Sequence, residues 1–262
     1  MRLLNSIFRL LFVLTLGFSF VAPAEAAEEK TVEERYEDGE RFSRRGYYIK
    51  ALEEFNTIRN LHREHPLAVQ SELAIADVYY NQGEWDIARM AYDEFMRLHP
   101  RHERLDYAVF QLGMTSFEKA PRIAARDQTS TRHALNTWTG FGNRFPDSGY
   151  REVVEENIAI CRNRLARKEM QIGYFYFRKG AFAAAIGRFE RLLGRYPDSP
   201  DRPRTLVLMA IALGELGERE RALEVVGNFR ENHPDNRRAQ TLLRRKGQVW
   251  LNATEELESE TP

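Results

Sequence analysis

The chain has 262 residues, of which 43% are hydrophobic and 11% aromatic, so wholesale disorder is excluded and a sizeable core is expected. Its 39 Lys and Arg residues balance 39 Asp and Glu residues. The chain therefore lacks the net basic charge that favours binding to nucleic acid, and we expect no nucleic-acid partner.

Residues 1–26 are predicted to form a secretory signal peptide. Arg2 and Arg9 lie near its start, the apolar run LLFVLTLGFSFV follows, and small residues in VAPAEAA end it. Cleavage is expected after Ala26 rather than after Ala24, because cleavage after Ala24 would leave Pro23 at a poor position next to the cleavage site. The apolar run is short for a membrane span, so an uncleaved leader acting as an inner-membrane tether is the weaker alternative.

The only cysteine is Cys161, so the exported monomer is expected to contain no internal disulfide. No cysteine directly follows the leader, where a bacterial lipoprotein carries its lipid. Cys161 lies within the apolar-patterned stretch VVEENIAICRNRLA, which favours a small buried side chain over a reactive thiol.

The remaining chain repeats a two-helix pattern whose clearest copy is GYFYFRKGAFAAAIGRFERLLGRYP, residues 173–197. Small residues allow the paired helices to approach, a glycine permits the turn between them, and an aromatic residue fills the space between neighbouring units. In four copies the turn glycine precedes the repeat alanine by five residues: Gly46 and Ala51, Gly83 and Ala88, Gly180 and Ala185, Gly217 and Ala222. A looser copy contains Ala134 and Trp138, with its turn expanded around APRIAARDQTSTRH.

This pattern is typical of tetratricopeptide repeats. It predicts an all-α protein, a right-handed α-solenoid of about five helix pairs with a C-terminal capping helix. An ordinary helical bundle is the alternative. We expect helices at 31–44, 47–64, 67–81, 84–98, 103–119, 129–144, 149–179, 181–195, 203–216, 218–232 and 236–256. The predicted divisions are repeats 1–3 over 27–148, repeats 4–5 with the capping helix over 149–256, and a disordered tail over 257–262.

The sequence offers little for catalysis or cofactor binding. His99 and His102 flank Pro100, but the proline breaks the helix between them and no third ligand pattern follows, so a metal site is not expected. There is no phosphate-binding glycine loop, no GxSxG and no paired nucleophile and base. We expect a protein that is not an enzyme and has no cofactor.

The first helix of each pair is expected to line a concave inner surface that suits an extended peptide. Its residues one turn apart are predicted to be Tyr36, Glu40 and Arg44 in copy one, Leu73, Asp77 and Tyr80 in copy two, and Tyr107, Phe110, Met114 and Phe117 in copy three. Packing against the next repeat is an equal alternative for Phe110 and Phe117.

Four stretches resemble one protein family. They are FMRLHPRHERLDYAVFQLG from residue 95, RDQT from 126, NRFPDSGY from 143, and RLARKEMQIGYFYFRKGAFAAAIGRFERLLGRYPDSP from 164. The chain resembles the outer-membrane protein assembly factor BamD family, also called YfiO or ComL. This resemblance implies five repeats, N-terminal repeats that receive unfolded outer-membrane β-barrel proteins, and C-terminal repeats that dock on the barrel subunit BamA.

The resemblance also implies a location at the periplasmic face of the outer membrane, within a complex that includes other assembly lipoproteins. Because the lipid-bearing cysteine of the family is missing, we expect protein partners to hold the chain there. A rival interpretation is a periplasmic repeat adaptor of the division or peptidoglycan machinery, which the HPRH and DQT matches disfavour.

Three arginines are expected to dock the partner: Arg162, Arg167 and Arg188. The first two belong to a basic run on the long predicted helix, together with Arg164 and Lys168. Arg188 precedes the packing aromatic Phe189, where a charge is costly unless it is paired. The alternative for Arg188 is a salt bridge inside the stack, to Glu169 or Glu190.

Overall fold

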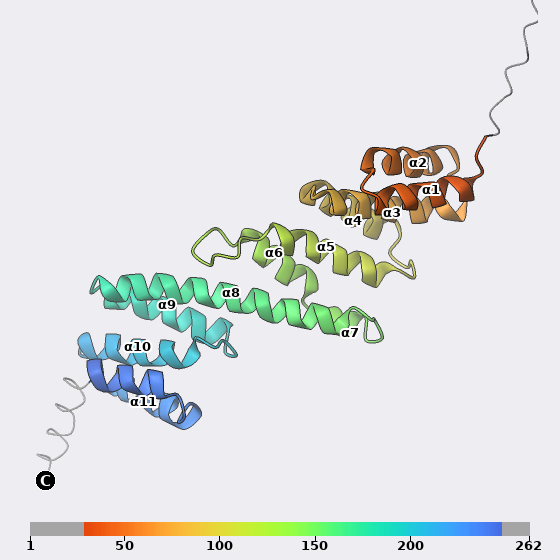
Figure 1. The fold of residues 1–262 in the computed structure, drawn as a ribbon. Coiled ribbons are helices and arrows are strands. Elements are labelled where there is room, and N and C mark those ends of the chain that lie inside the picture. Colours follow the sequence, from red (N-terminus) through yellow and green to blue (C-terminus); the bar gives the residue numbers. More distant parts are fainter. Residues whose placement is uncertain (1–28, 248–262) are drawn as a thin grey trace, which may run out of the picture.

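The computed structural model describes residues 29–247, which form eleven labelled helices and no strand (Figure 1). They are α1 (Val32–Arg44), α2 (Tyr48–Leu61), α3 (Pro66–Gln82), α4 (Trp85–Leu98), α5 (Leu105–Lys119), α6 (Thr129–Trp138), α7 (Phe141–Arg144), α8 (Arg151–Arg178), α9 (Phe182–Arg195), α10 (Arg202–Glu215) and α11 (Arg219–Asn232). Residues 237–247 are also helical. The predicted signal peptide, the predicted tail and the last residues of the predicted capping helix lie outside the described residues.

The helices stack in chain order from α1 to α11, as Figure 1 shows. The main packing pairs join helices that follow one another in the sequence, with α6 packing on α8 across the short α7. First helices of neighbouring pairs also contact each other, as α1 does α3 and α8 does α10. This serial contact pattern confirms the predicted all-α solenoid and excludes the bundle, whose helices would surround one shared core.

The turns inside the helix pairs require glycine. Gly180 lies between α8 and α9 with φ of +73°, a left-handed conformation that residues with a Cβ rarely adopt. The same geometry recurs at Gly46, Gly83 and Gly217. The predicted turn role of these glycines is confirmed.

A second set of glycines lets an aromatic ring reach the backbone of the neighbouring helix. A Cβ added to Gly173 would lie 2.5 Å from Cε1 of Phe189, and one added to Gly113 would lie 2.1 Å from Nε1 of Trp138. Phe189 and Trp138 are both fully buried. The helix pairs therefore pack at distances that leave no room for a side chain at these glycines.

One predicted helix is wrong in its extent. Residues 129–144 were expected to form a single helix, but the structure divides them into α6 and α7 at Gly140, where φ is +79°. Thr139 already has an extended ψ of 123°, and its hydroxyl donates to the carbonyl of Leu135. Because neither residue keeps helical dihedral angles, the chain turns there toward α8.

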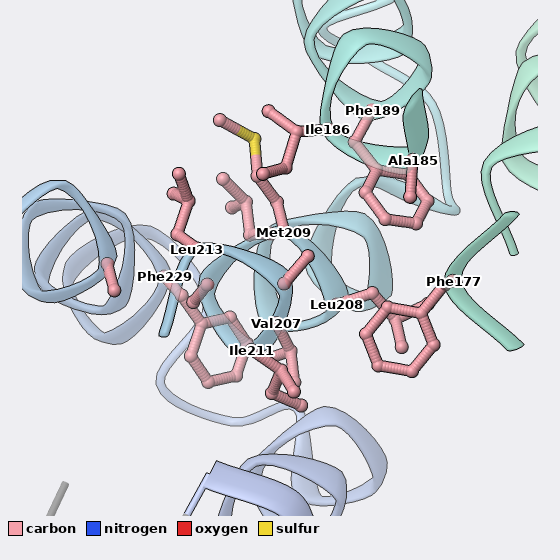
Figure 2. Packing of buried hydrophobic residues seen from close by; sticks show 14 of the residues in the cluster. Phe177, Ala185, Ile186, Phe189, Val207, Leu208, Met209, Ile211, Leu213 and Phe229 are labelled. Carbon is pink, nitrogen blue, oxygen red and sulfur yellow. The ribbon is translucent and has the colours of Figure 1, made fainter. Parts of the chain in front are cut away.

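The long predicted helix is confirmed as the unbroken α8, which joins the two halves of the stack. The largest hydrophobic cluster lies around its C-terminal end, α9, α10, α11 and residues 237–247. In Figure 2, Phe177 from α8 and Leu208 from α10 lie next to each other within this cluster. Cys161 is fully buried in α8, and burial raises the pKa of its thiol to about 11, as expected for a structural cysteine.

Candidate peptide-binding face

A partly buried polar network links repeats 2 and 3. The hydroxyls of Tyr92 and Tyr107 both donate to Oδ1 of Asp77, over 2.5 and 2.8 Å. Gln111 in turn donates to the Tyr107 hydroxyl over 3.0 Å. Burial raises the pKa of the Asp77 carboxyl, and the two tyrosine hydrogen bonds oppose that rise. Asp77 therefore fixes the orientation of Tyr107 across the boundary between two repeats.

Two further tyrosines border this network with half-buried rings. Tyr36 from α1 packs edge-on against Phe55, with ring centroids 5.4 Å apart. Tyr80 from α3 packs edge-on against Trp85, with centroids 5.1 Å apart, and burial raises its pKa to about 12. Both side chains thus combine a packed ring with a hydroxyl, which suits contact with mixed apolar and polar surfaces.

A cation that the sequence analysis did not predict lies beside one of these tyrosines. Arg104, just before α5, places its guanidinium 4.4 Å from the ring centroid of Tyr107. Arg44 instead lies in the last turn of α1, 69% exposed, where it pairs with Glu40 over 3.3 Å. Sequence reasoning missed Arg104, although the predicted helix 103–119 includes it, because the inner face of copy three was predicted only from Tyr107 onward. Its position three residues before Tyr107, one helical turn away, was the available signal.

Several of the predicted inner-face residues pack inside the stack. Leu73 is fully buried in the core of repeat 2, so its expected exposure is wrong. Phe110 stacks on Tyr150 with centroids 4.8 Å apart, and Phe117 packs against Trp138 at 5.7 Å. Phe110 therefore packs against Tyr150 at the start of α8, as the packing alternative predicted, whereas Phe117 packs against α6 of its own repeat; both side chains stay partly exposed. Met114 is half-buried in the same cluster.

The three arginines expected to dock a partner all have carboxylate neighbours within the stack. Arg162 lies 3.6 Å from Asp198, and Arg167 lies 3.7 Å from Asp201, both in the segment between α9 and α10. Arg188 donates to Glu169 over 3.1 Å.

Arg188 thus forms a salt bridge inside the stack, with Glu169 and not Glu190 as its partner, while its side chain stays 31% exposed. The neighbouring Arg164 stacks over the ring of Phe117 at 4.8 Å, which ties the basic run to repeat 3.

A family model described as YfiO, outer membrane lipoprotein, matches residues 28–234, which is most of the chain. The chain belongs to the YfiO family. Its relatives include the outer membrane protein assembly factor BamD of Neisseria meningitidis serogroup A, 26% identical over 220 residues, 80% of this chain and 82% of that protein. BamD of Xylella fastidiosa strain Temecula1 is 24% identical over 86% of this chain and 80% of its own length. BamD of Vibrio cholerae is 23% identical over 79% of this chain and 90% of its own length.

The DQT motif of this YfiO-family chain closes the expanded turn of repeat 3. Gln128 is fully buried, donates to the carbonyls of Pro121 and Ile123 over 3.2 and 3.0 Å, and accepts from the Thr131 hydroxyl. Asp127 accepts from the backbone N–H of Thr129 over 3.2 Å at the start of α6. The motif therefore has a structural role in this member of the family.

The histidine-proline stretch around Pro100 lies at the joint between repeats 2 and 3. His99 forms a 2.7 Å contact with Glu72 of α3, and both His99 and His102 pack against Phe95. Residues 29–247 contain no group of three or more His, Cys, Asp or Glu side chains arranged to hold a metal ion. Within the same range, no helix is long and apolar enough to cross a membrane.

Proposed function

We propose that this chain is a non-catalytic scaffold and adaptor in the assembly of outer-membrane β-barrel proteins. The observation that carries the proposal is the match to the YfiO family over residues 28–234, together with relatives that are themselves named outer membrane protein assembly factors. The solenoid suits this role because stacked repeats present an extended concave surface instead of an enclosed catalytic cavity.

In this proposal, the N-terminal repeats bind the C-terminal segment of an unfolded barrel protein. Tyr36, Tyr80 and Tyr107 would cover its apolar side chains, and Tyr107 is pre-oriented by Asp77 at little further entropic cost. Arg44 is exposed and available for a carboxylate, and Arg104 adds a second cation beside Tyr107.

Photo-crosslinking in the full chain tests this face. A crosslinker at Tyr36 or Tyr80 should capture a barrel segment, whereas one at Met90, which is 58% exposed on α4, should not. Adducts at Met90 without adducts at the two tyrosines would refute the assignment. All three positions are on helix surfaces, so a difference between them reports the location of the peptide.

The C-terminal repeats and α8 would dock on a BamA-like barrel subunit through Arg162, Arg167 and Arg188. Arg167 remains 60% exposed beside Asp201, so an acidic partner could replace or share that ion pair. Docking should then weaken as salt increases. Arg167→Glu is expected to reduce co-purification of the barrel subunit, while Arg195→Glu, an exposed charge change on α9, should leave it intact.

We further propose that these partners hold the chain at the periplasmic face of the outer membrane. The protein should pellet with outer membranes at low salt and move to the soluble fraction when the barrel subunit is depleted. Retention after depletion would show a separate anchor.

Co-purification from envelope extracts tests the function as a whole. Recovery of the barrel subunit with other assembly lipoproteins supports it, and recovery of peptidoglycan enzymes instead would support the rival role.

A further inference from the structure

A groove of about 510 Å³ lies in repeats 4 and 5. These repeats are far along the stack from repeats 1–3, as Figure 1 shows. Its walls come from α8, α10 and the helical residues 237–247. Tyr174 and Phe177 stand at the same repeat positions as Asp77 and Tyr80, as judged from their distance to the repeat alanine. The two halves of the chain therefore present different side chains at equivalent repeat positions.

The floor of this groove is apolar and its rim is basic. The floor consists of the buried side chains of Phe177, Leu208 and Ile211, which are labelled in Figure 2. Tyr174 also lines the groove. Arg178, Arg204 and Lys246 line the rim, against a single acidic lining residue, Glu215.

The rim cations are not neutralised by the described part of the chain. Arg204 lies over the ring of Tyr174 at 5.0 Å. Among residues 29–247, none of Arg178, Arg204 and Lys246 has a carboxylate within the 4.0 Å of an ion pair, unlike Arg162, Arg167 and Arg188. The groove thus offers apolar contact and unpaired positive charge together, a combination that fits a segment with large apolar side chains followed by acidic ones.

We propose that residues 248–262 of this same chain, QVWLNATEELESETP, cover the groove. Lys246 lines the groove, so the segment begins beside it. The segment contains Trp250, Leu251 and Leu257 for the apolar floor. It contains four glutamates and no basic residue, which complements the rim.

Tethering favours this occupant over one in solution. Attachment to the same chain within a few residues of the groove gives an effective concentration in the millimolar range, so even a weak contact is largely formed. The groove of the C-terminal half is then closed in the isolated protein, and any partner that uses it must displace the segment. The tyrosine face of the N-terminal half is unaffected, so this inference stands or falls separately from the proposed function.

Fluorine NMR of the full chain labelled with 5-fluorotryptophan tests the proposal. The chain has three tryptophans, Trp85, Trp138 and Trp250, and the last is assigned by Trp250→Phe. The Trp250 signal should be shifted from its random-coil position and show little solvent isotope effect. The other two signals report in the same spectrum that the stack remains folded.

Two adjacent charge reversals provide a matched pair. Lys246→Glu removes a rim cation, and Arg245→Glu changes an exposed neighbour that does not line the groove. Lys246→Glu should raise the exposed population of Trp250 about two- to five-fold, the effect of one exposed ion pair, and Arg245→Glu should not. Trp250→Ala should also speed hydrogen exchange in residues 174–182.

Three results would overturn the proposal. A random-coil Trp250 signal with a full isotope effect would show that the segment does not bind. A shift that grows with protein concentration would assign the groove to the segment of a second copy. Protection of residues 174–182 that appears only on adding the purified barrel subunit would assign the groove to that partner.

Discussion

Replacing Gly173 with alanine is expected to destabilise the protein, although alanine is the better helix former. The added Cβ would lie 2.5 Å from Cε1 and 2.8 Å from Cδ1 of Phe189, and 3.2 Å from the Cβ of Arg188. Phe189 is fully buried, so its ring has no free space into which to move. The two helices α8 and α9 must therefore separate or the ring must leave its rotamer.

The magnitude follows from two opposing effects. Overpacking of a tight core costs about 1–3 kcal/mol. Alanine in place of glycine inside a helix contributes about 0.5–1 kcal/mol in the other direction. Gly187→Ala is the matched control, because Gly187 is in α9 of the same repeat and has no atom within 4 Å of an added Cβ. The propensity effect is common to both variants, so their stabilities should differ by about 1–3 kcal/mol.

Urea and thermal unfolding followed by circular dichroism measure the difference. For a chain of this size, each kcal/mol corresponds to about 2–4 °C in melting temperature. Gly187→Ala should melt at or above the wild type and Gly173→Ala below it. Equal stabilities for the two variants would refute the close-packing argument. The corresponding position in repeat 2 is Ala76, also fully buried, so the spacing of that helix pair accommodates the methyl group.

Three further predictions concern polar contacts. Burial raises the pKa of Asp77, so its contribution to stability is complete below the ordinary carboxyl value of about 4 and is lost as pH rises through the raised value. Asp77→Asn should remove that dependence, and parallel melting curves of variant and wild type across pH would contradict it. Arg188→Glu should cost about 1 kcal/mol by opposing Glu169, with recovery when Glu169→Arg is added; a swap without recovery would argue against the pair. Gln128→Ala should cost about 1–3 kcal/mol and speed hydrogen exchange over residues 120–128, and unchanged exchange there would exclude Gln128 as the closure of that turn.

The repeat architecture was predictable from the sequence because its signals are local. A turn glycine five residues before a small helix residue specifies one helix pair, and repeating that unit specifies the stack without long-range information. The unbroken α8 was likewise predictable from residues close in the chain. Gly140 was the exception. Its positive φ separates α6 from α7, although the sequence pattern predicted one continuous helix over 129–144.

The candidate site depended on tertiary structure for a different reason. Helical register predicted inner-face positions for Tyr36, Asp77, Tyr80 and Tyr107, but it could not tell an open position from one that a neighbouring segment covers. Phe110 is covered because Tyr150 stacks on it from a segment 40 residues later.

The tertiary structure also decided which ion pairs form. In the sequence, Arg162 and Arg167 are part of a basic run on one predicted helix, and only the folded stack brings Asp198 and Asp201 beside them. The sequence by itself determined the repeat, its turns and its family, because these depend on neighbours along the chain. The tertiary structure alone decided which side chains remain available to a partner, because that depends on which residues the winding of the solenoid brings into contact.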